Sequence, residues 1–355
     1  MAQDNPVQPA TNRTGKATRT LLLLVLLGLA VHLLLPQIAT LEHSLQVLKG
    51  MTWWAVGLAA GAQVLSYLGS GVLLQAAVAM TGDRLSVIRS TLITTASYSI
   101  GLVAGGMVGS GAATYRWARG SGVSAEGALL AGWLPALVYD GALLFVSVFG
   151  LLYLLVVHDL TALQALSFGL IVVLLGLMAV ALVWGTRHRP QLTSLVASIA
   201  RRWAAVRRRP YDPALTQASI GRLLNAWDRL GEEGWRGPAL GAALNTLFDM
   251  LTLYLIFIAA GRRVSPAVLL AGYGLPLLLG KAPLLPGGVG IVESTMAALY
   301  TSLGVPNAVA VVVILIYRFF SFWLPSMVGF PLVPYLQHIA VGPNKDEPAD
   351  RGTLL

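Results

Sequence analysis

Long apolar runs separated by short polar breaks make up most of the chain. Several runs, such as Trp53–Met80 and Ala125–Val157, exceed the ~20 residues that an α-helix needs to cross a bilayer. Others are shorter or are interrupted by glycine and proline. The pattern predicts an all-α fold, a polytopic helical membrane protein with about eight hydrophobic segments. The apolar runs are Leu21–Ile38, Trp53–Met80, Thr91–Gly111, Ala125–Val157, Leu163–Trp184, Pro238–Ala260, Pro266–Leu279, the segment from Glu293 to Leu299, and Pro306–Tyr335.

One apolar stretch is broken in a way that is unusual for a membrane helix. Between Leu275 and Leu299 the chain passes through Lys281, then a segment rich in Pro and Gly, and then Glu293. Broken backbone leaves N–H and C=O groups unpaired, so it is tolerated at membrane depth only where protein or a wet cavity surrounds it. The break therefore predicts a functional element. Its helix-breaking residues are Pro283, Pro286, Gly287, Gly288 and Gly290.

Composition supports the membrane assignment and excludes several kinds of chemistry. Of the 355 residues, 56% are hydrophobic and only 11% are charged, whereas soluble domains have roughly 25% charged residues. The chain contains no cysteine, which excludes disulfides and zinc–thiolate sites. We expect the net charge of +9 to reflect membrane orientation and contacts with anionic lipid, with no role in binding nucleic acid.

The polar segments predict a single membrane domain made of two halves. An arginine-rich connector separates the halves, and its apolar residues at helical spacing predict amphipathic helices. The connector either lies on anionic lipid at the membrane surface or carries its arginines only because they set the topology. We expect the first apolar run to be an uncleaved helix and not a signal peptide. The predicted parts are a flexible arm at 1–19, an integral-membrane domain at 20–340 with its first half at 20–185, its basic connector at 186–236 and its second half at 237–336, and a polar tail at 337–355.

The distribution of charge predicts the topology. The basic N-terminal arm and the connector, which holds ten arginines, should both be cytoplasmic. Five apolar runs lie between them, so one run must enter and leave on the same side. The glycine-rich run Thr91–Gly111 is the best candidate for this re-entrant hairpin, and Pro266–Leu299 is predicted to form a matching hairpin from the opposite face. Ala104-Gly105-Gly106 resembles Pro286-Gly287-Gly288, which fits two inverted halves.

Charged residues within or beside the apolar runs are the candidates for a functional site. Each costs ~2.5–3.5 kcal/mol at the bilayer centre unless it finds a partner or water. An arginine can pair with a lipid phosphate through two hydrogen bonds, and a glycine turn that opens a helix offers backbone N–H groups. The acidic residues would balance the cations, attract a cationic headgroup or carry a coupling proton. The candidates for binding a lipid phosphate are Arg318, Gly287, Gly288, Gly290, Lys281 and Arg116, and those for charge pairing or coupling are Glu293, Asp249 and Asp140.

Each of these charges also has a purely structural interpretation. Glu293 would stabilise its own helix, because a carboxylate in a first turn is favourable. Arg318 would form a fixed bridge to Glu293 or Asp249, and the buried aspartates would be bridge partners. Lys281 would be an anchor whose ammonium reaches the membrane surface, and Arg116 a charge that sets topology. The sequence alone leaves both interpretations open.

Two segments of the second half resemble a known signature. LLPGGVGIVESTMAALYTSLGV followed by ILIYRFFSFWLPSMVGF is similar to the flippase-like family related to the transmembrane domain of lysylphosphatidylglycerol synthases. The earlier segment GGMVGSGAATYRW is similar to the family's first-half region, although Ala104 stands where a proline is expected. The resemblance spans most of residues 20–335 and implies lipid translocation by a stand-alone protein without the aminoacyltransferase domain. The residues that carry it are Pro286, Gly287, Gly288, Gly290, Glu293, Gly304, Tyr317, Arg318, Trp323, Pro325 and Gly329.

The expected function is that of a lipid flippase in the cytoplasmic (inner) membrane of a prokaryote. It would move a phospholipid or a polyprenyl-phosphate lipid through a groove lined by buried charges. The alternatives are an integral-membrane lipid-modifying enzyme and a membrane partner subunit of a lipid or glycolipid synthesis system. The chain lacks the HExxH, GxSxG and P-loop motifs, so we expect no enzyme activity, no cofactor and no metal. The expected partners are membrane lipids, with a lipid-synthesis enzyme as a further candidate.

Overall fold

The computed structural model describes residues 41–103, 106–157, 161–206, 234–281 and 286–340, together with 212–214, 217, 221 and 228. Within these residues every regular element is a helix, as the apolar pattern predicted. The predicted arm, the first apolar run at Leu21–Ile38 and most of the polar tail lie outside them. The elements are α2 (Leu41–Lys49), α3 (Trp53–Ala79), α4 (Val87–Val103), α5 (Met107–Gly120), α6 (Ala125–Val157), α7 (Ala162–Arg187), α8 (Arg189–Val206), α10 (Arg236–Ala259), α11 (Pro266–Leu279), η1 (Pro286–Gly288), α12 (Ile291–Ser302), α13 (Asn307–Arg318), η2 (Phe319–Trp323) and α14 (Leu324–Ala340).

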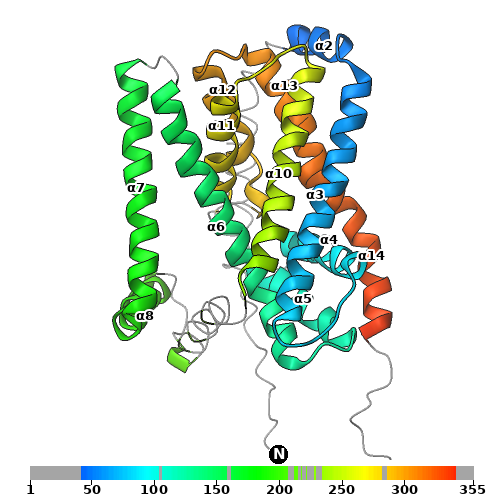
Figure 1. Cartoon of the computed structure of the whole chain (residues 1–355), viewed down its shortest axis with the longest axis vertical. Helices are drawn as coiled ribbons and strands as arrows, with labels where there is room; N and C mark the ends of the chain where they lie inside the picture. Colours follow the sequence, from blue (N-terminus) through cyan, green and yellow to red (C-terminus); the bar gives the residue numbers. More distant parts are fainter. Residues whose placement is uncertain are drawn as a thin grey trace, which may run out of the picture.

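Long apolar helices run the height of the molecule (Figure 1). Among the described residues, four helical stretches are long and apolar enough to cross a membrane, namely α3, α6, α10 and the stretch Asn307–His338 that combines α13, η2 and α14. α4 and α11 are shorter apolar helices. The chain is therefore a multi-pass, all-α membrane protein.

Two pairs of short helices enter the bundle from opposite ends (Figure 1). α4 and α5 have 17 and 14 residues and pack against each other at the end where α8 lies. α11 and α12 have 14 and 12 residues and pack together at the end where α2 lies. At ~1.5 Å per residue each helix extends roughly 18–26 Å, less than the ~30 Å hydrocarbon core. The two pairs lie where the sequence predicted hairpins and approach from opposite ends of the bundle; that each enters and leaves the membrane on one face stays a prediction.

The first hairpin is longer than its apolar run. The sequence predicted a hairpin over Thr91–Gly111, whereas the helices extend from Val87 to Gly120. The additional residues of α5 include exposed Tyr115 and Arg116 and buried Trp117. The first hairpin therefore has a polar end that its apolar run did not include.

The two halves share one order of elements with opposite orientation. α3 and α10 lie side by side and run in opposite directions (Figure 1). Each is followed by a hairpin of short helices and then by a long helical stretch, α6 in the first half and α13–α14 in the second. In the sequence, α7 and α8 follow the first half and precede the second. The first hairpin packs on α3 through α4, whereas the second packs mainly on α6 through α11 and on α13 through α12.

Small residues allow α3 and α10 to approach closely. A Cβ added to Gly69 would lie 2.5 Å from the backbone nitrogen of Asn245. The Asn245 amide Nδ2 donates to the Ser66 carbonyl at 2.8 Å, and the Ser66 hydroxyl donates to the Asn245 carbonyl at 3.0 Å. In a bilayer, where apolar burial does not drive helix association, close backbone packing and such interhelical hydrogen bonds provide much of the attraction.

The turns beside the first hairpin are joined by Asp83. Its Oδ2 accepts hydrogen bonds from the hydroxyl of Ser124 at 2.5 Å and from that of Thr81 at 2.8 Å. The backbone N–H of Ser124 also donates to this oxygen, at 3.2 Å. These bonds, led by the one from the Ser124 hydroxyl, hold the pKa of Asp83 below its usual value, because they favour the charged form. The α3–α4 turn is thereby fixed to the turn that begins α6.

The crossing at Gly69 gives a prediction about stability. Gly69→Ala should lower the apparent thermal unfolding temperature in detergent, because its Cβ meets backbone, and overpacking of this kind costs roughly 1–3 kcal/mol. Gly61→Ala is the matched control on the same helix, since a Cβ there meets nothing within 4 Å. The control should be neutral or stabilising, because alanine favours a helix by ~1 kcal/mol over glycine. Equal effects of the two substitutions would contradict the close approach.

Candidate functional site

The break in the second hairpin is built from glycines that other residues could not replace. α11 ends before Gly280, and the chain re-forms a short turn at η1 before α12 begins. Gly287, Gly288 and Gly290 have φ values of 67°, 65° and 85°, a left-handed region that side chains rarely adopt. A Cβ at Gly288 would also lie 2.5 Å from the carbonyl oxygen of Gly280. The two sides of the break therefore pass backbone against backbone.

Glu293 closes the start of α12. It occupies the third position of the helix, and its Oε2 accepts the backbone N–H of Gly290 at 2.7 Å. Its Oε1 accepts the Nε–H of Arg318 at 2.6 Å. The predicted capping role is thus present, and the same carboxylate forms the predicted bridge to Arg318.

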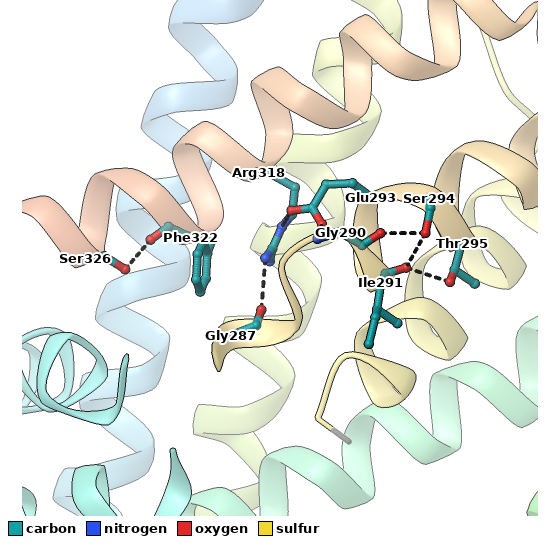
Figure 2. Close-up of polar contacts among 9 residues, drawn as sticks. All are labelled: Gly287, Gly290, Ile291, Glu293, Ser294, Thr295, Arg318, Phe322 and Ser326. Carbon is teal, nitrogen blue, oxygen red and sulfur yellow. Dashed lines mark hydrogen bonds and ion pairs between the residues drawn. The ribbon is translucent and has the colours of Figure 1, made fainter. Parts of the chain in front are cut away.

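Arg318 is held by three groups of the protein itself, Glu293, Gly287 and Phe322 (Figure 2). Besides Glu293, its guanidinium donates to the carbonyl of Gly287 at 3.1 Å and lies 4.2 Å from the ring centroid of Phe322. The side chains of Arg318 and Glu293 are only 5% and 15% exposed. The arginine therefore fastens the glycine turn by its carbonyl, and the bridge to Glu293 that the sequence offered as one possibility is present. Phosphate binding by Arg318 and by the glycines of the turn stays a prediction.

A π-helical segment directly follows Arg318. This segment, η2, extends from Phe319 to Trp323, and the Tyr67 hydroxyl of α3 donates to the carbonyl of Phe320. π-bulges release carbonyls from the regular helical pattern and are frequent at functional sites. Here the irregularity lies within the single long stretch Asn307–His338, between α13, which ends at Arg318, and α14.

Lys281 and Asp140 form a second ion pair, more open than the first. Asp140 lies near the middle of the 33-residue α6, and Lys281 lies two residues beyond the end of α11. The ammonium contacts the Asp140 carboxylate and lies 4.8 Å from the ring centroid of Tyr139. The two side chains are 36% and 29% exposed. This pair is therefore the one that a ligand can reach without opening the fold.

Asp249 lies in a polar cluster at the centre of the bundle. It is 6% exposed and accepts hydrogen bonds from Gln63 Nε2 at 3.0 Å, the Tyr273 hydroxyl at 2.8 Å and the Tyr317 hydroxyl at 2.6 Å. Among the described residues it forms no ion pair. The sequence predicted Asp249 but missed these three partners. An amide within the apolar run of α3 was a usable signal for Gln63. Tyr317 stood out only as part of the family signature, and nothing set Tyr273 apart from other membrane tyrosines.

The tip of the first hairpin reaches the break of the second. A Cβ at Gly287 would lie 3.1 Å from Leu102 Cδ2, at the end of α4. Gly106, which precedes α5, has φ 68°, so the two hairpins turn in a related way. Arg116 lies ten residues beyond Gly106 and is exposed on α5. It is not part of the ion pairs around the break, and its predicted role in phosphate binding stays a prediction.

These features define a class: a polytopic helical membrane protein in which two hairpins of short helices from opposite ends of the bundle meet beside one buried and one partly exposed ion pair. The chain belongs to the family described as the lysylphosphatidylglycerol synthase TM region, whose model matches residues 19–329. This confirms the resemblance seen in the sequence.

Curated relatives match part of the chain. It is 36% identical over 89 residues to a UPF0104 membrane protein of Methanothermobacter thermautotrophicus, covering 25% of this chain and 26% of that protein. It is 35% identical over 85 residues to one of Pyrococcus horikoshii, covering 24% and 25%. With one of Methanocaldococcus jannaschii it shares 28% identity over 123 residues, covering 34% and 37%. The chain thus aligns with about a quarter to a third of the length of these relatives.

The buried pair gives a prediction that does not depend on function. Arg318→Ala and Glu293→Ala should each lower the free energy of unfolding by roughly 3–5 kcal/mol, because each leaves a buried charge without its partner. The double variant should cost less than the sum by about 0.5–3 kcal/mol. Unfolding in mixed micelles, followed by circular dichroism, measures these values. Lys281→Ala is the control, since exposed pairs contribute only ~0–1 kcal/mol. Strict additivity would show that the two side chains are not coupled.

Proposed function

We propose that this protein translocates a lipid with a phosphate-containing headgroup, either a phospholipid or a polyprenyl-phosphate lipid, across the membrane. The observation that carries the proposal is the meeting of two half-length hairpins from opposite faces beside ion pairs at mid-depth. Each hairpin leads from one membrane face to the middle of the bundle. The two hairpins together outline a route along which a headgroup can cross the membrane. Membership of the lysylphosphatidylglycerol synthase TM region family supports a role that involves membrane lipids.

The ion pairs supply the polar contacts that a headgroup loses when it leaves water. An incoming phosphate competes with Asp140 for Lys281, because that pair is partly exposed. Deeper in the fold, Arg318 and the glycine turn become available to the phosphate only when Glu293 releases the guanidinium. The competing carboxylates keep the positive charges balanced while the route is empty, which limits the cost of charge at membrane depth.

The acyl chains remain in an apolar environment during this movement. An apolar pocket of about 320 Å³ lies between the α2–α3 end of the bundle and the stretch around Arg318. It is open to the apolar surface and offers a place for a lipid chain beside the span that carries the arginine. The lining residues are Leu48, Trp53, Val56, Leu315, Ile316, Phe319 and Phe320.

In this proposal the protein moves the lipid without altering it covalently and needs no cofactor. The N-terminus and the connector face the cytoplasm, because the connector carries ten arginines and basic loops stay on the cytoplasmic side. α8 belongs to this connector and lies at the end of the bundle where the first hairpin opens (Figure 1). The first hairpin then opens to the cytoplasm and the second to the outside.

Lipid transfer should depend on Lys281. In vesicles containing a fluorescent phospholipid, the purified protein should expose inner-leaflet label to a reductant added outside. Lys281→Ala should slow this step roughly 10–100-fold, because a hydrogen bond to a charged group contributes ~1.5–3 kcal/mol. Arg201→Ala on the exposed face of α8 is the control and should leave the rate unchanged. Wild-type protein that exposes no label, with phospholipid or with polyprenyl phosphate, would refute the proposal.

Orientation is testable because the chain has no cysteine. Arg84→Cys, in the turn before the first hairpin, and Arg262→Cys, in the turn before the second, each introduce one thiol at an exposed position. In intact cells a membrane-impermeant maleimide should label Arg262→Cys and spare Arg84→Cys until the cells are lysed. Labelling of both thiols from outside would rule out the two-hairpin topology, and the reverse pattern would invert the orientation.

A further inference from the structure

Asp249 connects more helices of the fold than either of the ion pairs beside the break does. It lies on α10, and its three donors come from three other helices: Gln63 from α3, Tyr273 from α11 and Tyr317 from α13. α11 is the first arm of the broken hairpin, and α13 is the span that ends at Arg318. A change in the charge of Asp249 therefore changes the hold on the second hairpin and on its neighbour at the same time.

The surroundings of Asp249 act on its ionised form in opposing directions. Among the described residues, the cation that acts on it is Arg318, which Glu293 and the Gly287 carbonyl already engage. Asp140 is held by Lys281. Burial opposes the ionised carboxylate, whereas three hydrogen-bond donors favour it. The other titratable groups that face it are tyrosines, namely Tyr67 on α3, Tyr98 on α4, Tyr139 on α6, Tyr273 on α11 and Tyr317 on α13.

Gln63 is suited to serve both protonation states of this carboxylate. The hydroxyls of Tyr273 and Tyr317 donate to Oδ2 of Asp249, whereas the amide nitrogen of Gln63 donates to Oδ1. Gln63 is 2% exposed, and its Oε1 has no hydrogen-bond partner among the described residues. An amide carries a donor at one end and an acceptor at the other. When a proton binds Oδ1, a half-turn of the amide brings Oε1 to accept it, so the buried pair keeps a hydrogen bond in either state.

We propose that Asp249 is a proton-binding site, with Gln63 as its switching partner, and that its protonation drives movement of the second hairpin. A proton from water binds Oδ1 and converts the carboxylate to a neutral carboxylic acid, and its release restores the negative charge. Protonation weakens the hydrogen bonds from Tyr273 and Tyr317, because bonds to a charged acceptor are roughly twice as strong as neutral ones. α11 and α13 are then held less firmly. The coupling of this site to lipid movement rests on the proposed translocation, whereas the site itself does not.

Infrared difference spectroscopy of the full-length protein in vesicles tests the proton site directly. As the pH falls, a carbonyl band of a protonated carboxylic acid should appear in the wild type and be lost in Asp249→Asn. Gln63→Leu should retain the band and shift it to higher frequency, because the acid loses its acceptor. Asp212→Asn, an exposed connector position, should leave the band unchanged. A band that persists in Asp249→Asn, or that Gln63→Leu does not shift, would overturn the proposal.

A pH gradient separates this inference from the proposed function. Vesicles carrying fluorescent phosphatidylglycerol should show a wild-type rate of lipid transfer that changes with the imposed gradient, beyond any change in protein-free vesicles. Transfer that occurs but ignores the gradient would overturn the coupling and leave the translocation proposal standing. If no lipid moves while the Asp249 band still titrates, the proton site is upheld and the translocation proposal is the one that fails.

Discussion

At the break in the second hairpin, two backbone groups each form a hydrogen bond with a charged side chain, one with a carboxylate and the other with a guanidinium. The N–H of Gly290 donates to Glu293, and the carbonyl of Gly287 accepts from Arg318. The two side chains also pair with each other at 2.6 Å. A membrane offers no water for an interrupted helix, so such groups must be satisfied from within the protein. This three-way contact lets the chain turn at mid-depth, and the short helices on either side depend on it.

The placement of the hairpins depends on small residues as much as on charge. Gly69 brings α10 against α3, and α14 packs on α4 where Gly329 faces Ser99 and the Thr95 carbonyl. The meeting of the hairpin tips depends on these close approaches. A Cβ added to Gly287 would lie only 3.1 Å from Leu102 Cδ2, so the glycine turn and the end of α4 are close neighbours. The packing of the long helices thus determines the distance between two elements that begin at opposite faces of the membrane.

Much of this architecture could be predicted from the sequence, because each element has a local cause. Apolar runs give the spans, Pro286 and the following glycines give the break, and the odd number of runs between two basic segments gives the first hairpin. What the sequence could not give is pairing between distant side chains. It offered Glu293 and Asp249 as equal partners for Arg318, and it left Lys281 without a partner. The contact of Gln63 with Asp249 spans 186 positions, and only the packing of α3 on α10 brings them together.

The two hairpins are alike in backbone and unlike in chemistry. α12 has Gly290 before its first turn and a carboxylate at its third position, whereas α5 has Gly106 before its first turn and a glycine at the third, Gly109. The tip of the first hairpin instead presents Val103 and Val108, which are 73% and 66% exposed. Charges beside the break thus come from the second hairpin and the long helices, while the first contributes apolar surface. A lipid is itself divided into a charged and an apolar part, so a boundary between these two surfaces matches it better than a uniformly polar channel would.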